Sequence, residues 1–271
     1  NETKRLTDTR DGKQYWVAKL KDGNCWMTQN LDFDIPAGGL TSADSDVTST
    51  WNSSSAYPPT ATNTTISSNS SNTGTLSWDL GMYVKSDPDG YSNYCKEVAS
   101  LSDSSCTSAG WTDVSSMTPM TDGTTNEVIS TDNNTYNAHY LVGNLYQWNA
   151  ATAGTGGTIT SEEAMGSICP KGWTLPTSTS SGGFQALMTA YSITSNADST
   201  TRITQSPLYF NPSGYVFLGS LWSAGNEGGY WSSTATASTN NADYLFFYSR
   251  GVYPSNNYIR YYGRSVRCLA R

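Results

Sequence analysis

The last forty residues of this chain contain no Lys, Glu, Gln, Met, Trp or His. The first 231 residues hold 7 Lys, 6 Glu, 5 Gln and 6 Met, so even usage would place roughly four of these residues in the final segment. Tyr, Asn, Ser and Arg fill the segment instead. Tyr offers a large, rigid, amphipathic surface at low entropy cost, and Ser and Asn offer adaptable hydrogen bonds. The composition is typical of a contact surface.

Charged residues are also scarce, at 14% of the chain, whereas Ser, Thr, Asn and Gly abound. This composition is typical of a secreted or surface β-rich protein rather than a cytosolic helical enzyme. The net charge of −7 is uneven, because residues 1–200 carry 9 basic and 20 acidic side chains, while residues 201–271 carry six Arg and two acidic side chains. An acidic chain does not suit a nucleic acid or another polyanion as its partner. The C-terminal Arg residues can still anchor a local acidic epitope.

The sequence lacks a CxxC motif and a Cys/His cluster, which argues against a zinc site. In an exported protein, five cysteines allow two disulfides and one free thiol. We expect Cys95 and Cys106 to close a short loop, and Cys169 and Cys268 to form a long-range pair. Cys25 competes for either pair.

No run of about 18 apolar residues occurs, so we expect no membrane insertion of this segment. The first ten residues, NETKRLTDTR, do not have the pattern of a signal peptide. The cysteine content and the polar composition predict an extracellular or cell-surface location.

The N-terminal part, residues 5–35, predicts a β-hairpin in which QYWVAKL and CWMTQNLDF flank the turn KDGN. An Asp-Gly pair between alternating apolar residues is a strong hairpin signal. Residues 40–135 follow as a long insertion. Its first part, residues 40–74, is rich in Ser, Thr and Asn and has few side chains that could offset the ordering of the backbone by burial.

Two later segments have apolar residues at helical spacing. They are residues 140–151, with Leu141, Leu145 and Trp148, and residues 184–191, with Phe184, Leu187, Met188 and Tyr191. After Pro207 the chain has the pattern of short strands and turns, in the segments GYVFLGSL, GGYWSST, DYLFFYS, YIRYYG and SVRCLA. Two helices followed by antiparallel strands predict an α+β domain.

Five segments share their order with a known family: DGNCWMTQNL at 22–31, VGNLYQWNAA at 142–151, ICPKGWTLPT at 168–177, GGYWSST at 228–234 and GRSVRCLAR at 263–271. Together they resemble the Fibrobacter succinogenes major paralogous domain, which belongs with the C-type-lectin-like folds, near the formylglycine-generating enzymes. The resemblance implies one C-type-lectin-like domain over residues 1–271, with two helices and a mostly antiparallel sheet. Its parts would be an N-terminal hairpin (1–39), the insertion (40–135) and the core (136–271).

Four tryptophans lie within these motifs, namely Trp26, Trp148, Trp173 and Trp231. Tryptophans can serve as carbohydrate-stacking platforms, but their place in the recurring motifs favours core anchors, since large aromatic side chains dominate core energetics.

Within that fold class, the C-terminus resembles the variable proteins of diversity-generating retroelements. Such elements convert AAY codons into NNY codons, which cannot encode Lys, Glu, Gln, Met or Trp, and this matches the residues that are missing here. The resemblance implies a secreted or surface-displayed ligand-binding protein. Its face formed by about residues 230–264 would be a diversified recognition surface, most plausibly for protein ligands.

The resemblance assigns individual positions to display or to the scaffold. The displayed, ligand-binding positions would be Asp243, Tyr244, Phe246, Tyr248, Arg250, Tyr253, Asn256, Asn257, Tyr258, Arg260, Tyr262 and Arg264. The scaffold positions would be Trp231, Ser232, Ser233, Leu245, Phe247, Val252, Pro254, Gly263, Ser265, Val266, Arg267 and Cys268. Alternation along DYLFFYS places Leu245 and Phe247 on one face of a strand, and Tyr244, Phe246 and Tyr248 on the other.

Three alternatives remain open. The Tyr-rich end can be a plain antiparallel sheet, since Tyr favours strands on propensity alone. An undiversified adhesin or glycan-binding module of the same fold is the second. The third is an enzyme like the formylglycine-generating relatives, whose chemistry requires a reactive cysteine pair near the C-terminus. This chain has only Cys268 there, in a motif that suggests a structural disulfide, so we expect no enzyme.

We expect no cofactor, and calcium is the one metal with candidate ligands. Asp87 and Asp89 in DPDG, with Asp32 and Asp34 in LDFD, supply carboxylates. A calcium ion takes six to eight oxygens, and the sequence has no spaced loop like an EF-hand. The EPN, QPD and WND signatures of calcium-dependent lectins are absent as well.

Overall fold

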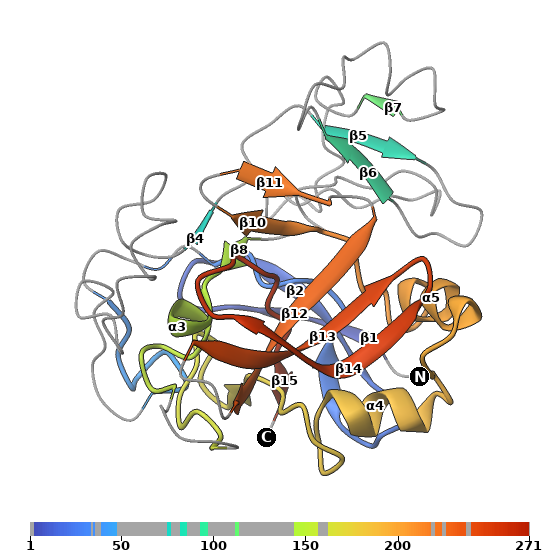
Figure 1. The fold of residues 1–271 in the computed structure, drawn as a ribbon. Coiled ribbons are helices and arrows are strands. Elements are labelled where there is room, and N and C mark those ends of the chain that lie inside the picture. The colour runs from blue at the N-terminus through green and yellow to red at the C-terminus, as the bar shows by residue number, and fades with distance from the viewer. Residues whose placement is uncertain are drawn as a thin grey trace.

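The computed structural model describes residues 3–33, 35, 39–47, 144–156, 162–217, 220–223, 226–236 and 240–270, and the backbone of four short strands between residues 75 and 113. This part of the chain combines antiparallel sheets with short helices, which confirms the expected α+β class (Figure 1). None of its helices is long and apolar enough to cross a membrane.

The two ends of the chain share one sheet. Its strands follow the order β1 (Thr3–Thr7), β2 (Gln14–Lys19), β3 (Cys25–Met27), β15 (Leu269–Ala270) and β9 (Trp173–Thr174), and all neighbours are antiparallel. The predicted hairpin is confirmed in β2 and β3. Its turn contains Gly23 at φ 88°, a conformation that glycine adopts readily. The Asp22 carboxylate stabilises the turn by accepting a hydrogen bond from Trp26 Nε1 at 2.8 Å.

A second sheet is formed by β12 (Glu227–Ala235), β13 (Asn241–Tyr248) and β14 (Gly251–Ile259), in that order. In Figure 1, helices α4 (Phe184–Ala190) and α5 (Ala197–Thr204) lie at one side of this sheet, next to β14. The strand predicted at residues 258–263 is wrong beyond Ile259, because the chain turns there. The remaining strands pair as β10 (Tyr215–Phe217) with β11 (Ser220–Trp222), β8 (Leu145–Tyr146) with β4 (Thr75–Leu76), and β5 (Met82–Lys85) with both β6 (Asn93–Lys96) and β7 (Thr112–Asp113).

The described residues form three helices rather than the two expected. They are α3 (Trp148–Ala151), α4 (Phe184–Ala190) and α5 (Ala197–Thr204). Helix α4 confirms the prediction for residues 184–191. The prediction for residues 140–151 is wrong at Leu145–Tyr146, because the backbone N–H and C=O of Tyr146 both bond to Arg264, at 2.7 and 2.8 Å. This tertiary pairing outweighs the helical spacing and leaves the four-residue α3.

The core consists of two hydrophobic clusters on opposite faces of the β12–β14 sheet. One contains Trp148 and Trp231, and the other contains Trp26, Phe184 and Phe247. Those three tryptophans are fully buried, whereas Trp173 is half-buried and packs against the first cluster.

A disulfide joins Cys169 to Cys268 inside the first cluster, which confirms the predicted long-range pair. It links the segment before β9 to the segment before β15, and 99 positions separate the two cysteines. Cys25 is free and exposed. Cys106 lies outside the described residues, so its pairing with Cys95 stays a prediction.

Candidate ligand-binding surface

The register of the β12–β14 sheet decides which side chains share a face. Trp231 pairs with Tyr244, and Tyr244 pairs with Asn256. Paired residues point to the same side of a sheet, and alternate residues of each strand follow them. The resulting surface, called here the aromatic face, comprises Glu227, Gly229 and Trp231 from β12, Tyr244, Phe246 and Tyr248 from β13, and Tyr253, Asn256 and Tyr258 from β14.

The opposite face of the same sheet carries residues of the second hydrophobic cluster. Tyr230, Leu245, Phe247 and Val252 are at most 1% exposed and share a cluster with Phe184 of α4. The alternation predicted for DYLFFYS is therefore observed, with Leu245 and Phe247 buried on the core side. Phe246 and Tyr248, on the other side, are half-buried.

Stacked rings form a row along the half-buried part of the aromatic face, which faces solvent. Phe246 stacks on Tyr248 with ring centres 5.3 Å apart, and Tyr253 stacks on both at 6.1 Å. Tyr244 continues the row, 5.8 Å from Phe246. A hydrogen bond with the Tyr248 phenol raises the pKa of Tyr253. Mutual packing restricts these side chains before any ligand arrives.

Arg264 lies within the aromatic face and is only 4% exposed. Its guanidinium carbon is 3.9 Å from the centre of the Tyr244 ring and 5.5 Å from those of Tyr215, Trp231 and Tyr258. Burial lowers the pKa of the guanidinium. It forms no ion pair with a described residue, and its Nε has no hydrogen-bond partner. Attraction to the faces of the surrounding rings, together with the charge of Glu227 beyond ion-pair distance, favours the buried cation.

Gly229 makes room for this cation. A Cβ at position 229 would overlap the Nη1 atom of Arg264 and lie 3.3 Å from its Cδ and Cζ. The backbone of β12 thus approaches the guanidinium more closely than any other residue type would permit. The motif GGYWSST contains this glycine, but the reason for it is visible only in three dimensions.

The aromatic face ends in a second group of rings. Tyr258 is 40% exposed and meets Tyr262 edge-on at 4.7 Å, and Tyr262 stacks on Phe217 at 4.7 Å. Burial and a hydrogen bond with Tyr258 raise the pKa of Tyr262 well above its usual range. Trp222, which pairs with Tyr215 across β10 and β11, is 52% exposed. The sequence did not indicate that Tyr215, Phe217 and Trp222 belong here, since they precede the Tyr-rich segment.

Four of the twelve residues expected on display are buried, so for them that expectation is wrong. Tyr244, Arg260, Tyr262 and Arg264 are 3–8% exposed. Arg260 donates from Nε to the Asn241 carbonyl at 2.8 Å and lies 4.2 Å over the Trp148 ring. Aromatic rings and backbone carbonyls contributed by other segments enclose these side chains. These buried side chains support the aromatic face from beneath, and we call the buried residues of this kind its frame. They are not free to contact a ligand.

The remaining positions are half-buried or exposed, but they do not all share one face. Phe246, Tyr248, Tyr253, Asn256 and Tyr258 lie together on the aromatic face, and Arg250 is exposed in the turn between β13 and β14. Asp243 and Asn257 pair with each other on the opposite side. The Asp243 carboxylate accepts a hydrogen bond from Ser178 at 2.7 Å, and burial raises its pKa, with a smaller contribution from Glu163.

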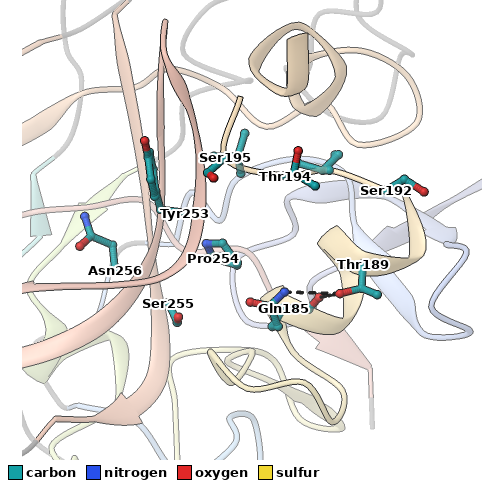
Figure 2. Close-up of a pocket in the computed structure, with 11 residues that line it drawn as sticks. Gln185, Thr189, Ser192, Thr194, Ser195, Tyr253, Pro254, Ser255 and Asn256 are labelled. Carbon is teal, nitrogen blue, oxygen red and sulfur yellow. Dashed lines mark hydrogen bonds between the residues drawn. The ribbon is translucent and has the colours of Figure 1, made fainter. Parts of the chain in front are cut away.

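A groove of about 520 Å³ adjoins the aromatic face (Figure 2). It lies between β14 and the chain that leads from α4 to α5, and Tyr253 and Asn256 contribute to both the groove and the face. Nothing in the sequence pattern pointed to it, because its two walls are about sixty positions apart.

The described residues contain no group of three or more His, Cys, Asp or Glu side chains suited to a metal. Of the carboxylates considered for calcium, Asp32 pairs with Lys13 at 3.1 Å, and Asp34, Asp87 and Asp89 lie outside the described residues. Cys268 is held in its disulfide.

The chain was compared with protein-family models, with curated proteins and with solved structures. None of the three comparisons found a match. The resemblance of the five motifs therefore stays a prediction.

Proposed function

We propose that this chain is a ligand-binding protein of C-type-lectin-like fold, secreted or held at a cell surface, whose aromatic face has been diversified by a retroelement to recognise protein ligands. The observation that carries the proposal is a row of stacked, half-buried rings on one face of a sheet whose other face is core. The disulfide between Cys169 and Cys268 supports an oxidising, extracellular setting.

The proposed contact residues are those on or beside the face that retain exposure. They are Phe246, Tyr248, Arg250, Tyr253, Asn256 and Tyr258. Aromatic residues and Arg are enriched in protein interfaces, and Tyr with Asn and Ser is typical of binding loops selected for recognition. NNY codons can encode all four residue types found at these six positions.

The frame beneath this surface explains how such residues could vary without loss of fold. Trp231, Leu245, Phe247 and Val252 are at most 1% exposed and make the packing contacts of the three strands. Exposed positions usually tolerate substitution within about 0.5 kcal/mol. Variation confined to the contact residues therefore leaves most of the folding free energy untouched.

A display library tests the proposal. NNY codons would be placed at Tyr248, Tyr253, Asn256 and Tyr258, and the library selected for binding to a purified protein such as lysozyme. We expect folded binders from this library, and few folded members from a control library that randomises Trp231, Leu245, Phe247 and Val252. Equal loss of folding in both libraries would contradict the proposed division of frame and contact surface.

The retroelement part is tested at the DNA level. We expect a near-repeat of the 3′ end of the gene that carries adenines where the contact codons vary, and a reverse transcriptase gene nearby. A genome with neither would leave a binding surface without diversification.

A further inference from the structure

The groove beside β14 differs from the aromatic face in its lining, which is mostly polar and uncharged. One wall is the β14 segment 252–256, and the other comes from α4 and the chain that follows it (Figure 2). The lining residues are Gln185, Thr189, Ser192, Ile193, Thr194, Ser195, Val252, Tyr253, Pro254, Ser255 and Asn256. Its volume of about 520 Å³ falls within the usual range of small-molecule sites.

The lining carries many polar groups and no formal charge. Seven of the eleven side chains are hydroxyls of Ser or Thr or amides of Gln or Asn. The hydroxyls of Ser192, Ser195 and Ser255 are exposed and have no hydrogen-bond partner among the described residues. A ligand that matches this lining is neutral and dense in hydrogen-bond donors and acceptors.

One wall also offers an aromatic surface. Tyr253 is half-buried, and its stacking on Phe246 and Tyr248 fixes its orientation. Figure 2 shows the ring standing on β14 near Pro254, on the side of the groove where Ser195 lies. An aromatic ring with a polar hydroxyl suits a ligand that has both an apolar C–H face and polar edges.

The edge of β14 is poorly suited to an added peptide strand. Pro254 lacks a backbone N–H, and the pairing of β13 with β14 shifts register between Tyr244 and Phe246, opposite Pro254 and Ser255. A proline and a bulge on an edge strand both interrupt the ladder that strand addition requires. Recognition in the groove therefore rests on side chains.

The far wall is preformed. The backbone N–H of Ile193 donates to Met188 and that of Ser192 to Thr189, at 2.9 and 3.0 Å, which is the Schellman arrangement at a helix end. The chain then approaches β14 so closely that a Cβ at Gly251 would lie 3.0 Å from the carbonyl carbon of Ser195. These contacts fix the backbone that carries Ser192 and Ser195.

From these features we infer that the groove binds a neutral saccharide of one to three units, with a sugar ring against Tyr253 and its hydroxyls on Gln185, Ser192 and Ser195. Saccharide binding shares Tyr253 with the contact residues of the aromatic face, whereas its polar partners come from α4 and the chain that follows it. It requires neither a metal ion nor diversification of the contact residues.

A titration of the intact chain with maltose, cellobiose, lactose and chitobiose, followed by isothermal calorimetry and amide chemical shifts, tests the inference. We expect at least one of these sugars to bind and to shift the amides of residues 192–195 and 253–256. Gln185→Ala should weaken binding about tenfold, as expected for a lost hydrogen bond. Ser195→Trp should abolish it by filling the groove, whereas Ser181→Ala, an exposed serine outside the groove, should leave it unchanged.

Three results would overturn the inference: no binding by any of the four sugars, binding that survives Ser195→Trp, or groove shifts caused by a neutral Ser/Thr/Asn-rich peptide and by none of the sugars. The variants Gln185→Ala and Ser195→Trp lie outside the proposed contact residues. Failure of saccharide binding can therefore be told apart from failure of protein recognition, which the display library measures separately.

Discussion

The guanidinium of Arg264 lies 3.9 Å from the centre of the Tyr244 ring, in space that Gly229 leaves open on the neighbouring strand. The sequence places Arg264 among the displayed residues, but in the structure its side chain is buried beneath the aromatic face. Its position holds together Tyr215, Trp231 and Tyr258, which come from β10, β12 and β14. The residues beneath the aromatic face thus include a buried cation, Arg264, that forms no ion pair with a described residue.

Gly229→Ala should destabilise the fold by about 1–3 kcal/mol, the usual range for overpacking. The added Cβ would overlap Arg264 Nη1, and the enclosing rings leave the guanidinium little room to move. Urea unfolding measures the change. Because the two residues share this contact, the same substitution should cost less in an Arg264→Ala background. Equal costs in both backgrounds would contradict the proposed contact.

Trp231→Ala should cost about 3–5 kcal/mol, because it removes a fully buried ring. Its Nε1 also donates to the Tyr146 carbonyl at 2.8 Å, and that carbonyl would keep only the hydrogen bond from the Arg264 N–H. Asn257→Ala, at an exposed position on the same sheet, should change stability by less than about 0.5 kcal/mol. Thermal unfolding of the two variants, side by side, gives the ranking, and the reverse order would undo the separation of frame and surface.

Cys169→Ser should lower the free energy of unfolding by about 2–5 kcal/mol, the range for native disulfides that close long loops. The two half-cystines are 99 positions apart, so the link removes many conformations from the unfolded chain. Denaturation with and without reductant measures the effect. Cys25→Ser is the matched control, since that thiol is free and exposed and should make no comparable difference.

Ser192→Gly should stabilise the protein by about 1 kcal/mol. Ser192 has φ 53°, in the left-handed region that disfavours residues with a Cβ, at the position after a helix where glycine is usual. Ser195 does not share this conformation, so Ser195→Gly should not stabilise. A fall in melting temperature for Ser192→Gly would show that its side chain contributes more than its backbone conformation costs.

Asp243→Asn should stabilise the protein at neutral pH, and the gain should vanish in acid. Burial raises the pKa of this carboxyl above its usual value of 3.8, so in that interval the folded state binds more protons than the unfolded state. Stability contributed by this group is therefore present at low pH and is lost as pH rises through the raised pKa. Urea unfolding from about pH 3 to pH 7 would check the sign. If the wild type were the more stable protein at pH 7, the hydrogen bond from Ser178 would outweigh the cost of burying the Asp243 carboxylate.

Several local features followed from the sequence because they depend on near neighbours. Asp22 and Gly23 specify a turn by themselves, since one supplies a carboxylate for backbone and indole donors and the other adopts a positive φ. Phe184, Leu187 and Met188 share one side of α4 because three and four positions make a helical turn. The burial of Leu245 and Phe247 followed from the alternation of a strand.

Tertiary structure alone decided which of the C-terminal residues meet solvent. Arg264, Arg260 and Tyr262 belong to the same Tyr-, Asn- and Arg-rich composition as Tyr258, yet they are buried because rings from other segments close over them. Tertiary structure also decided the strand at Tyr146, whose backbone pairs with Arg264 across more than a hundred positions. It likewise formed the groove between α4 and β14. The composition of the last forty residues determined that they offer phenol, amide and guanidinium groups. Packing between distant segments determined which of these groups face outward, because the exposure of a side chain depends on neighbours that its own stretch of sequence does not contain.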